Sequence, residues 1–177
     1  MEHPDDDLLV GLAAGDARAF GVLYDRFGNR LYRVAVSMLH RREDAEDAVQ
    51  EVFIALVRSR HRLSAVRDLE AYLFAALHRA AARCAARRTR LPINAQTAVQ
   101  ETVAPSNQKD ESRLCEDLER ALRTLPVEQQ EVIALKIDGG LTFAQIGQVM
   151  GTNGNTAASR YRYALEKLRE LLNEECR

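Results

Sequence analysis

The sequence predicts an all-α fold, organised as two small helical domains joined by a flexible linker. Apolar residues recur at intervals of three and four along most of the chain, which gives a helix one apolar face. The strict alternation of apolar and polar residues that is typical of strands is nearly absent. The helical pattern stops in a stretch with two prolines and many small or amide side chains, so the domains are expected at residues 1–90 and 113–177, with the linker at 91–112.

The first domain is expected to be a helical bundle. A short helix containing Leu8, Leu9 and Leu12 precedes a long helix that starts at Asp16. The apolar stripe predicted for the long helix consists of Phe20, Leu23, Tyr24, Phe27, Leu31, Tyr32, Ala35 and Leu39.

An acidic helix follows, with five acids between Glu43 and Phe53 in a chain whose formal net charge is only −1. The apolar stripe expected to face the core consists of Ala45, Ala48, Val49, Val52, Phe53, Leu56 and Val57. Glu43, Asp47, Gln50 and Glu51 fall on the opposite face. Taken alone, such a charge run is typical of the solvated outer face of a core helix.

A basic loop and a further helix complete the first domain. The loop arginines are Arg58, Arg60, Arg62 and Arg67. The helix begins near Leu69 and ends with a run of arginines that no acid interrupts, namely Arg79, Arg83, Arg87, Arg88 and Arg90. Such a run usually marks a solvated helix end, but Tyr72 and His78 could stack on exposed bases beside it. The pattern therefore also fits a surface for single-stranded DNA.

The second domain has the pattern of a helix-turn-helix. Pro126 suits the first turn of a helix that Gly139 and Gly140 end. Thr142 and Gln145 then have capping-box spacing at the start of the next helix, and Gly151 provides its stop. A short Gly- and Asn-containing turn leads into a basic last helix, as in DNA-binding helix-turn-helix domains.

The last helix has an inward and an outward face. Ala157, Tyr161, Ala164 and Leu168 are expected to pack inward. The outward or flanking side chains suit phosphates and base edges in a major groove, and they are Thr156, Ser159, Arg160, Arg162 and Tyr163. Because the whole chain is nearly neutral, unaided DNA binding should be weak, and a second partner is expected.

Other classes of site are disfavoured by the sequence. Cys84, Cys115 and Cys176 are too far apart for a disulfide framework or paired zinc ligands, and the four histidines lack metal-site spacing, so neither a metal nor a cofactor is expected. No familiar catalytic signature is present, which makes an enzyme the weaker hypothesis. No apolar run approaches the roughly 20 residues of a membrane span, and the first residues are acidic, so a cytoplasmic location without membrane insertion is expected.

Two motifs together resemble the extracytoplasmic-function sigma factors of bacterial RNA polymerase. The acidic motif of that family is matched by Asp44, Ala45, Glu46, Asp47, Gln50, Glu51 and Phe53. The C-terminal motif is matched by Leu125, Pro126, Glu131, Val132, Leu135, Gly140, Leu141, Thr142, Ile146, Gly151, Thr156, Ser159, Arg160, Ala164, Leu168 and Arg169. The resemblance covers nearly the whole chain.

The resemblance implies a division of labour between a region 2-like first domain and a region 4-like second domain. The acidic helix would bind the β′ coiled coil of core polymerase through Asp44, Glu46, Asp47, Gln50, Glu51 and Phe53. The first domain would capture the minus-10 single strand through Arg60, His61, Arg62, Arg67, Tyr72, His78, Arg79, Arg83 and Arg87. The second would read the minus-35 duplex through Thr156, Ser159, Arg160, Arg162 and Tyr163. The family's further partners are the polymerase β flap and an anti-sigma factor.

The helix that would melt the promoter departs from the family pattern. Tyr72 stands where the family usually has Trp, and His78, Arg79 and Arg83 replace other expected residues. Two alternatives to a promoter-opening sigma factor therefore stay open. One is a stand-alone helix-turn-helix regulator, and the other is a sigma-like protein that binds polymerase without opening promoters.

Overall fold

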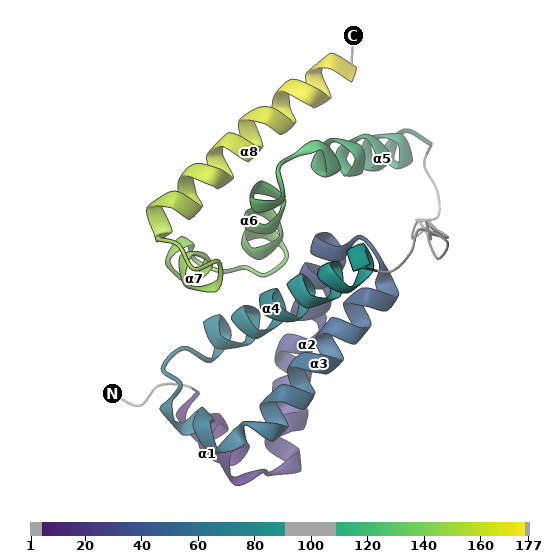
Figure 1. Ribbon diagram of the computed structural model, residues 1–177. Helices are drawn as coiled ribbons and strands as arrows, with labels where there is room; N and C mark the ends of the chain where they lie inside the picture. The colour runs from purple at the N-terminus through teal and green to yellow at the C-terminus, as the bar shows by residue number, and fades with distance from the viewer. Residues whose placement is uncertain (1–4, 91–108, 176–177) are drawn as a thin grey trace.

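The computed structural model describes residues 5–90 and 109–175, and within these ranges the chain contains helices and no strand, which confirms the all-α prediction (Figure 1). The elements are α1 (Asp6–Ala14), α2 (Ala17–Leu39), α3 (Arg42–Arg58), the short 3-10 helix η1 (Arg60–Ala65), α4 (Leu69–Arg90), α5 (Lys109–Thr124), α6 (Val127–Ile137), α7 (Phe143–Val149) and α8 (Gly154–Glu175). Helix α5 begins within the range predicted as linker, and the rest of that range lies outside the described residues.

The long helix α2 is the centre of the first bundle. Leu23, Phe27 and Leu31 recur at intervals of four and are fully buried, as the stripe predicted. Tyr24 was expected in the same stripe but is 59% exposed. The reason is that Tyr24 follows Leu23 by one residue and is therefore rotated by about 100° around the helix, onto the flank of the buried face.

Helix α3 packs on α2 and α4 with the small and apolar side chains that the sequence predicted. The buried members are Ala45, Ala48, Val49, Val52 and Leu56. Phe53 is only half-buried, and Val57 is 46% exposed. These two residues lie at the edges of the predicted stripe, where a neighbouring helix covers only part of a side chain.

The ends of α7 follow the predicted chemistry. The hydroxyl of Thr142 accepts a hydrogen bond from the backbone N–H of Gln145 at 3.2 Å, and the side chain of Gln145 accepts one from the backbone N–H of Thr142 at 2.9 Å. This reciprocal pair is the predicted capping box. Gly151 follows the helix with φ +65°, a left-handed conformation that glycine adopts without strain.

The two predicted domains pack against each other. Helix α6 contacts α2, and α7 contacts α4, so that α6 and α7 lie between α8 and the first bundle (Figure 1). One hydrophobic core includes Phe27 and Phe74 from the first domain together with Leu135, Leu141 and Ile146 from the second. A smaller core joins α5, α6 and α8 through Ala121, Leu125, Ile133, Ala164 and Leu168.

The turn of the helix-turn-helix generates a stability prediction. An added Cβ at Gly147 would lie 2.8 Å from backbone atoms of Asn153 and Gly154, so we expect Gly147→Ala to lower the free energy of unfolding by about 1–3 kcal/mol. The matched control is Gly21→Ala in α2, where an added Cβ would meet open space. That change should raise stability by about 0.5–1 kcal/mol. Urea denaturation followed by circular dichroism measures both variants, and a Gly147→Ala protein of unchanged stability would contradict the close approach.

Candidate functional site

The outward side of α3 carries a line of exposed side chains, which we call the α3 outer face. It consists of Glu43, Glu46, Asp47, Gln50, Ile54 and Val57. Ile54 is 43% exposed, and its place among acids is unusual for the polar face of an amphipathic helix. The face therefore combines negative charge with apolar area, which is typical of a surface that binds another protein.

Two acids of α3 do not belong to this face. Glu51 accepts two hydrogen bonds from Arg83 of α4, at 2.6 and 3.0 Å. Asp44 lies 3.6 Å from Arg88, which also donates to the backbone carbonyl of Leu39. The sequence assigned Glu51 to polymerase and Arg83 to DNA, but the structure brings the two side chains together.

Aromatic residues border the α3 outer face on the side of α2. The ring centroids of Tyr24 and Phe53 lie 5.3 Å apart, in a tilted arrangement. Val22, also from α2, is 55% exposed. The spacing of the apolar residues predicts Tyr24 in the core stripe, so its place at the surface was not expected from the sequence. Its position one residue after Leu23 was the signal that could have identified it.

The predicted single-strand surface is spread over two elements. His61 and Arg62 are exposed within η1, and Arg67 is exposed in the turn that follows it. Arg60 packs over the turn between α1 and α2, where a Cβ added at Gly15 would lie 3.1 Å from the Nε atom of Arg60. The guanidinium of Arg60 is thus directed toward α1.

On α4 the exposed members of the predicted surface are Arg79, Arg83 and Arg87. An Nη atom of Arg87 lies 2.8 Å from the thiol sulfur of Cys84, one turn away. Tyr72 is half-buried against the core of the first bundle.

His78 takes a different direction from these arginines. Its Nε2 atom lies 3.3 Å from a carboxylate oxygen of Glu131, which belongs to α6, and the His78 side chain is only 23% exposed. The second domain therefore covers His78, a contact that no local pattern in the sequence indicated.

Helix α8 has the inward face that the sequence predicted, with Ala157, Ala164 and Leu168 buried and Tyr161 half-buried. The predicted DNA-facing set divides by exposure. Arg162 and Tyr163 are exposed and adjacent, with the guanidinium 5.7 Å from the ring centroid. Thr156, Ser159 and Arg160 are half-buried. The side chain of Asn153 accepts a hydrogen bond from the backbone N–H of Thr156 at 2.7 Å and so caps the start of the helix.

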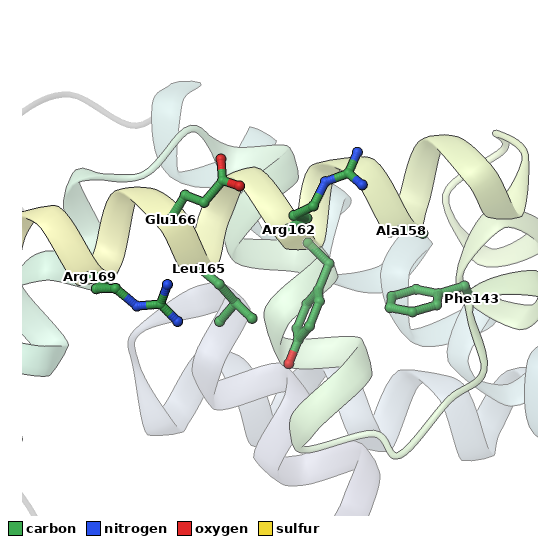
Figure 2. Close-up of a pocket in the computed structure, with 7 residues that line it drawn as sticks. Phe143, Ala158, Arg162, Leu165, Glu166 and Arg169 are labelled. Atoms are coloured by element: carbon green, nitrogen blue, oxygen red, sulfur yellow. The ribbon is translucent and has the colours of Figure 1, made fainter.

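A groove of about 410 Å³ runs along one side of α8 (Figure 2). Its residues are Phe143, Ala158, Tyr161, Arg162, Leu165, Glu166 and Arg169. Phe143 of α7 points toward α8. The centroids of the Phe143 and Tyr161 rings lie 5.6 Å apart. The sequence did not predict this groove because it forms only where α7 and α8 meet.

Two classes of site can be assessed over residues 5–90 and 109–175. No group of three or more His, Cys, Asp and Glu residues there could hold a metal ion. In the same ranges, every helix is too short or too polar to cross a bilayer.

Both domains match families of known proteins. Residues 23–103 match the family described as Sigma-70 region 2, and residues 115–168 match the one described as Sigma-70, region 4. The chain is also 30% identical over 172 residues to the ECF RNA polymerase sigma factor SigM of Mycobacterium tuberculosis H37Rv, an alignment that covers 97% of this chain and 86% of that protein.

Two solved structures have a similar fold. CnrH, in complex with the cytosolic domain of CnrY, matches with a TM-score of 0.70 and 24% identity over 96% of this chain and 97% of that chain. The sigma factor RpoE of Bartonella quintana, in complex with the anti-sigma factor NepR, matches with a TM-score of 0.72 and 24% identity over 89% of this chain and 98% of that chain.

The contact between Glu51 and Arg83 generates a testable expectation. The two side chains are 35% and 53% exposed, so a double-mutant cycle with Glu51→Gln and Arg83→Gln should give a coupling energy of about 0.2–1 kcal/mol. Chemical denaturation of the four proteins measures it. The control cycle pairs Arg83→Gln with Glu46→Gln from the α3 outer face, and it should give no coupling. Equal values from the two cycles would contradict a specific contact.

Proposed function

The chain belongs to the extracytoplasmic-function (ECF) sigma factors of RNA polymerase, as the sequence predicted, and from this premise we propose which of its surfaces carry out the steps of initiation. The protein directs transcription initiation as an alternative sigma factor, with core polymerase and promoter DNA as its partners. The observation that carries this conclusion is the presence of both sigma regions, in order, on a chain that aligns with a sigma factor over most of its length.

The α3 outer face is the proposed contact with the β′ coiled coil of polymerase. Glu46, Asp47 and Gln50 are exposed there, and Ile54 and Val57 extend the same line with apolar area. Charges on such a surface guide association and fix its register, while the apolar side chains supply most of the affinity. Phe53 supports the edge of the face through its contact with Tyr24.

The proposed minus-10 surface is built from the exposed arginines of α4 and the preceding loop. Arg67, Arg79 and Arg87 are available for phosphates. Arg83 could contact DNA only after it breaks its hydrogen bonds to Glu51. His78 could do so only after it breaks its contact with Glu131.

The proposed minus-35 reader is α8, with its N-terminal turns in the major groove. Arg162 and Tyr163 are exposed on it, and Ser159 lies one turn from both. We assign the β flap contact to the part of the groove that lies beyond these N-terminal turns, where Leu165 is 37% exposed and an apolar helix could bury it.

Three further points follow from the assignment. Polymerase performs the chemistry, so the chain itself acts without catalysis. The protein acts in the cytoplasm, because that is where polymerase and promoter DNA are found. An anti-sigma factor is a proposed partner, since RpoE, which shares this fold, was solved with one.

Run-off transcription tests the function directly, with core polymerase and promoter fragments from the source genome. A promoter-specific product is expected. A second candidate function is a polymerase-binding protein without promoter opening, which the engagement of His78 and Arg83 in contacts within the chain favours. That candidate would show polymerase binding with no product.

For the polymerase contact, we expect Asp47→Lys to weaken core binding, and Asp47→Lys with Glu46→Lys to weaken it by about tenfold or more, mainly through slower association. The measurement is surface plasmon resonance with core polymerase, alongside circular dichroism. The control is Glu128→Lys, which reverses an exposed acid of α6. If all variants bound alike, the α3 acids would serve only to solvate the helix.

For the duplex contact, we expect Arg160→Ala to weaken binding to every promoter in similar proportion and to lower the salt slope by about one unit, as loss of a phosphate contact does. Changes at Ser159 should instead alter sequence preference, by about 1–3 kcal/mol per affected base pair. Both are measured with holoenzyme on a panel of promoter variants. Unchanged promoter use by both proteins would place the α8 N-terminus away from the major groove.

A further inference from the structure

The groove beside α8 changes character along its length. Phe143, Ala158 and Tyr161 line the part beside the first turns of α8, whereas Glu166 and Arg169 line the part beside later turns (Figure 2). Ala158 is half-buried in the first part. This part lies within the N-terminal turns that we propose enter the major groove, so its apolar side chains face promoter DNA in the proposed complex.

Close packing between the starts of α7 and α8 holds this end of the groove in one shape. A Cβ added at Gly154 would lie 3.2 Å from the backbone oxygen of Phe143, so the two helices have little space between them here. The Phe143 ring also lies 5.6 Å from the Tyr161 ring, centroid to centroid, and its centroid is 4.9 Å from the Nζ atom of Lys136. The apolar wall is therefore formed before any DNA binds.

Ala158 occupies a position from which a side chain can reach base edges. It lies in the second turn of α8, and Arg162 follows it by one turn on the same side of the helix. The N-terminal residues of a recognition helix are the ones that contact base edges in a helix-turn-helix complex. The row that faces DNA thus begins with a methyl group and continues with an exposed guanidinium.

An alanine at such a position discriminates between bases by its lack of polar atoms. The only apolar group that a base edge presents in the major groove is the C5-methyl group of thymine. Contact between this group and the methyl of Ala158 removes apolar surface from water on both molecules. Opposite any other base, the same alanine would cover polar atoms without replacing their hydrogen bonds to water. The chemistry of Ala158 therefore favours thymine.

We propose that Ala158, supported by the ring of Phe143, determines one base of the minus-35 element, namely a thymine that it recognises by the C5-methyl group. The inference rests on the proposed function and adds a base preference to it. Arg160 and Arg162 lie within one turn of Ala158 and supply the positive charge that a DNA backbone requires beside this contact.

The neighbouring side chains have other preferences. The hydroxyl of Ser159 both donates and accepts, so it can bond to several bases. Arg162 has donors alone and favours the O6 and N7 acceptors of guanine. Thr156 carries a methyl group as well as a hydroxyl, so an experiment on the thymine contact has to separate Thr156 from Ala158.

A selection experiment tests the base preference with holoenzyme assembled from core polymerase and the full chain. The probe is a pool of promoter-length DNA duplexes that are randomised over a central segment. The wild-type chain should enrich thymine at one position of the minus-35 element. Ala158→Gln, which keeps a good helix former in α8, should replace that thymine with adenine, since a glutamine amide bonds adenine through two hydrogen bonds. Absence of an enriched thymine, or its retention with Ala158→Gln, would overturn the inference.

Removal of one methyl group from the DNA tests the contact itself. Deoxyuridine at the selected thymine should weaken binding of the wild-type holoenzyme by about three- to fivefold, as loss of one buried methyl group does. With Ala158→Gly, the same replacement should change binding by less than about twofold, because the partner methyl is already absent. The protein control is Lys167→Gly, which has a similar helix cost at an exposed site outside the groove and should keep the full methyl effect.

Two further comparisons separate the possible outcomes. Thr156→Ser removes the other methyl group and should keep the deoxyuridine effect, so loss of the effect in this variant would assign the thymine to Thr156 and overturn the role of Ala158. An equal effect in the wild-type and Ala158→Gly proteins would overturn it as well. A holoenzyme that selects no sequence would overturn the proposed function together with the inference, whereas a selected sequence whose binding is indifferent to the methyl group would overturn the inference alone.

Discussion

Burial of one face of α2 is the interaction on which the rest of the structure depends. Leu23, Phe27, Leu31 and Val34 are fully buried along it, and each such side chain contributes about 1.5–3 kcal/mol. Helix α2 packs against α1, α3, α4 and α6. The acids of α3, the arginines of α4 and the whole second domain are therefore all positioned relative to one helix.

Charge pairing between α3 and α4 determines what remains available to partners. Glu51 and Asp44 face Arg83 and Arg88, so part of the basic character of α4 is neutralised within the first domain. Glu46 and Asp47, on the opposite side of α3, are exposed, and they are the acids that we propose meet a protein partner. This distribution agrees with a near-neutral chain that reaches DNA through polymerase rather than alone.

Several parts of the candidate site could be predicted because neighbours within one turn determine them. The capping box of Thr142 and Gln145 depends on residues three apart, and the buried face of α8 depends on a spacing of three and four. Burial was predicted wrongly at the edges of the apolar stripes of α2 and α3. Tyr24 and Val57 have the right chemistry for a core, but the neighbouring helices leave them exposed.

The sequence by itself determined the long helices, the centres of their apolar faces and the two sigma motifs, since all of these are set by residues close together in the chain. It did not indicate the 3-10 helix η1 in the segment expected as a loop, nor the start of α5 within the expected linker. Only the tertiary structure decided that Glu51 meets Arg83, that His78 meets Glu131 and that Ser37 meets Asp138. These contacts join different helices, so they depend on how whole helices pack. A long polar side chain on a helix surface has several possible partners, and the buried apolar faces select among them by fixing where each helix lies.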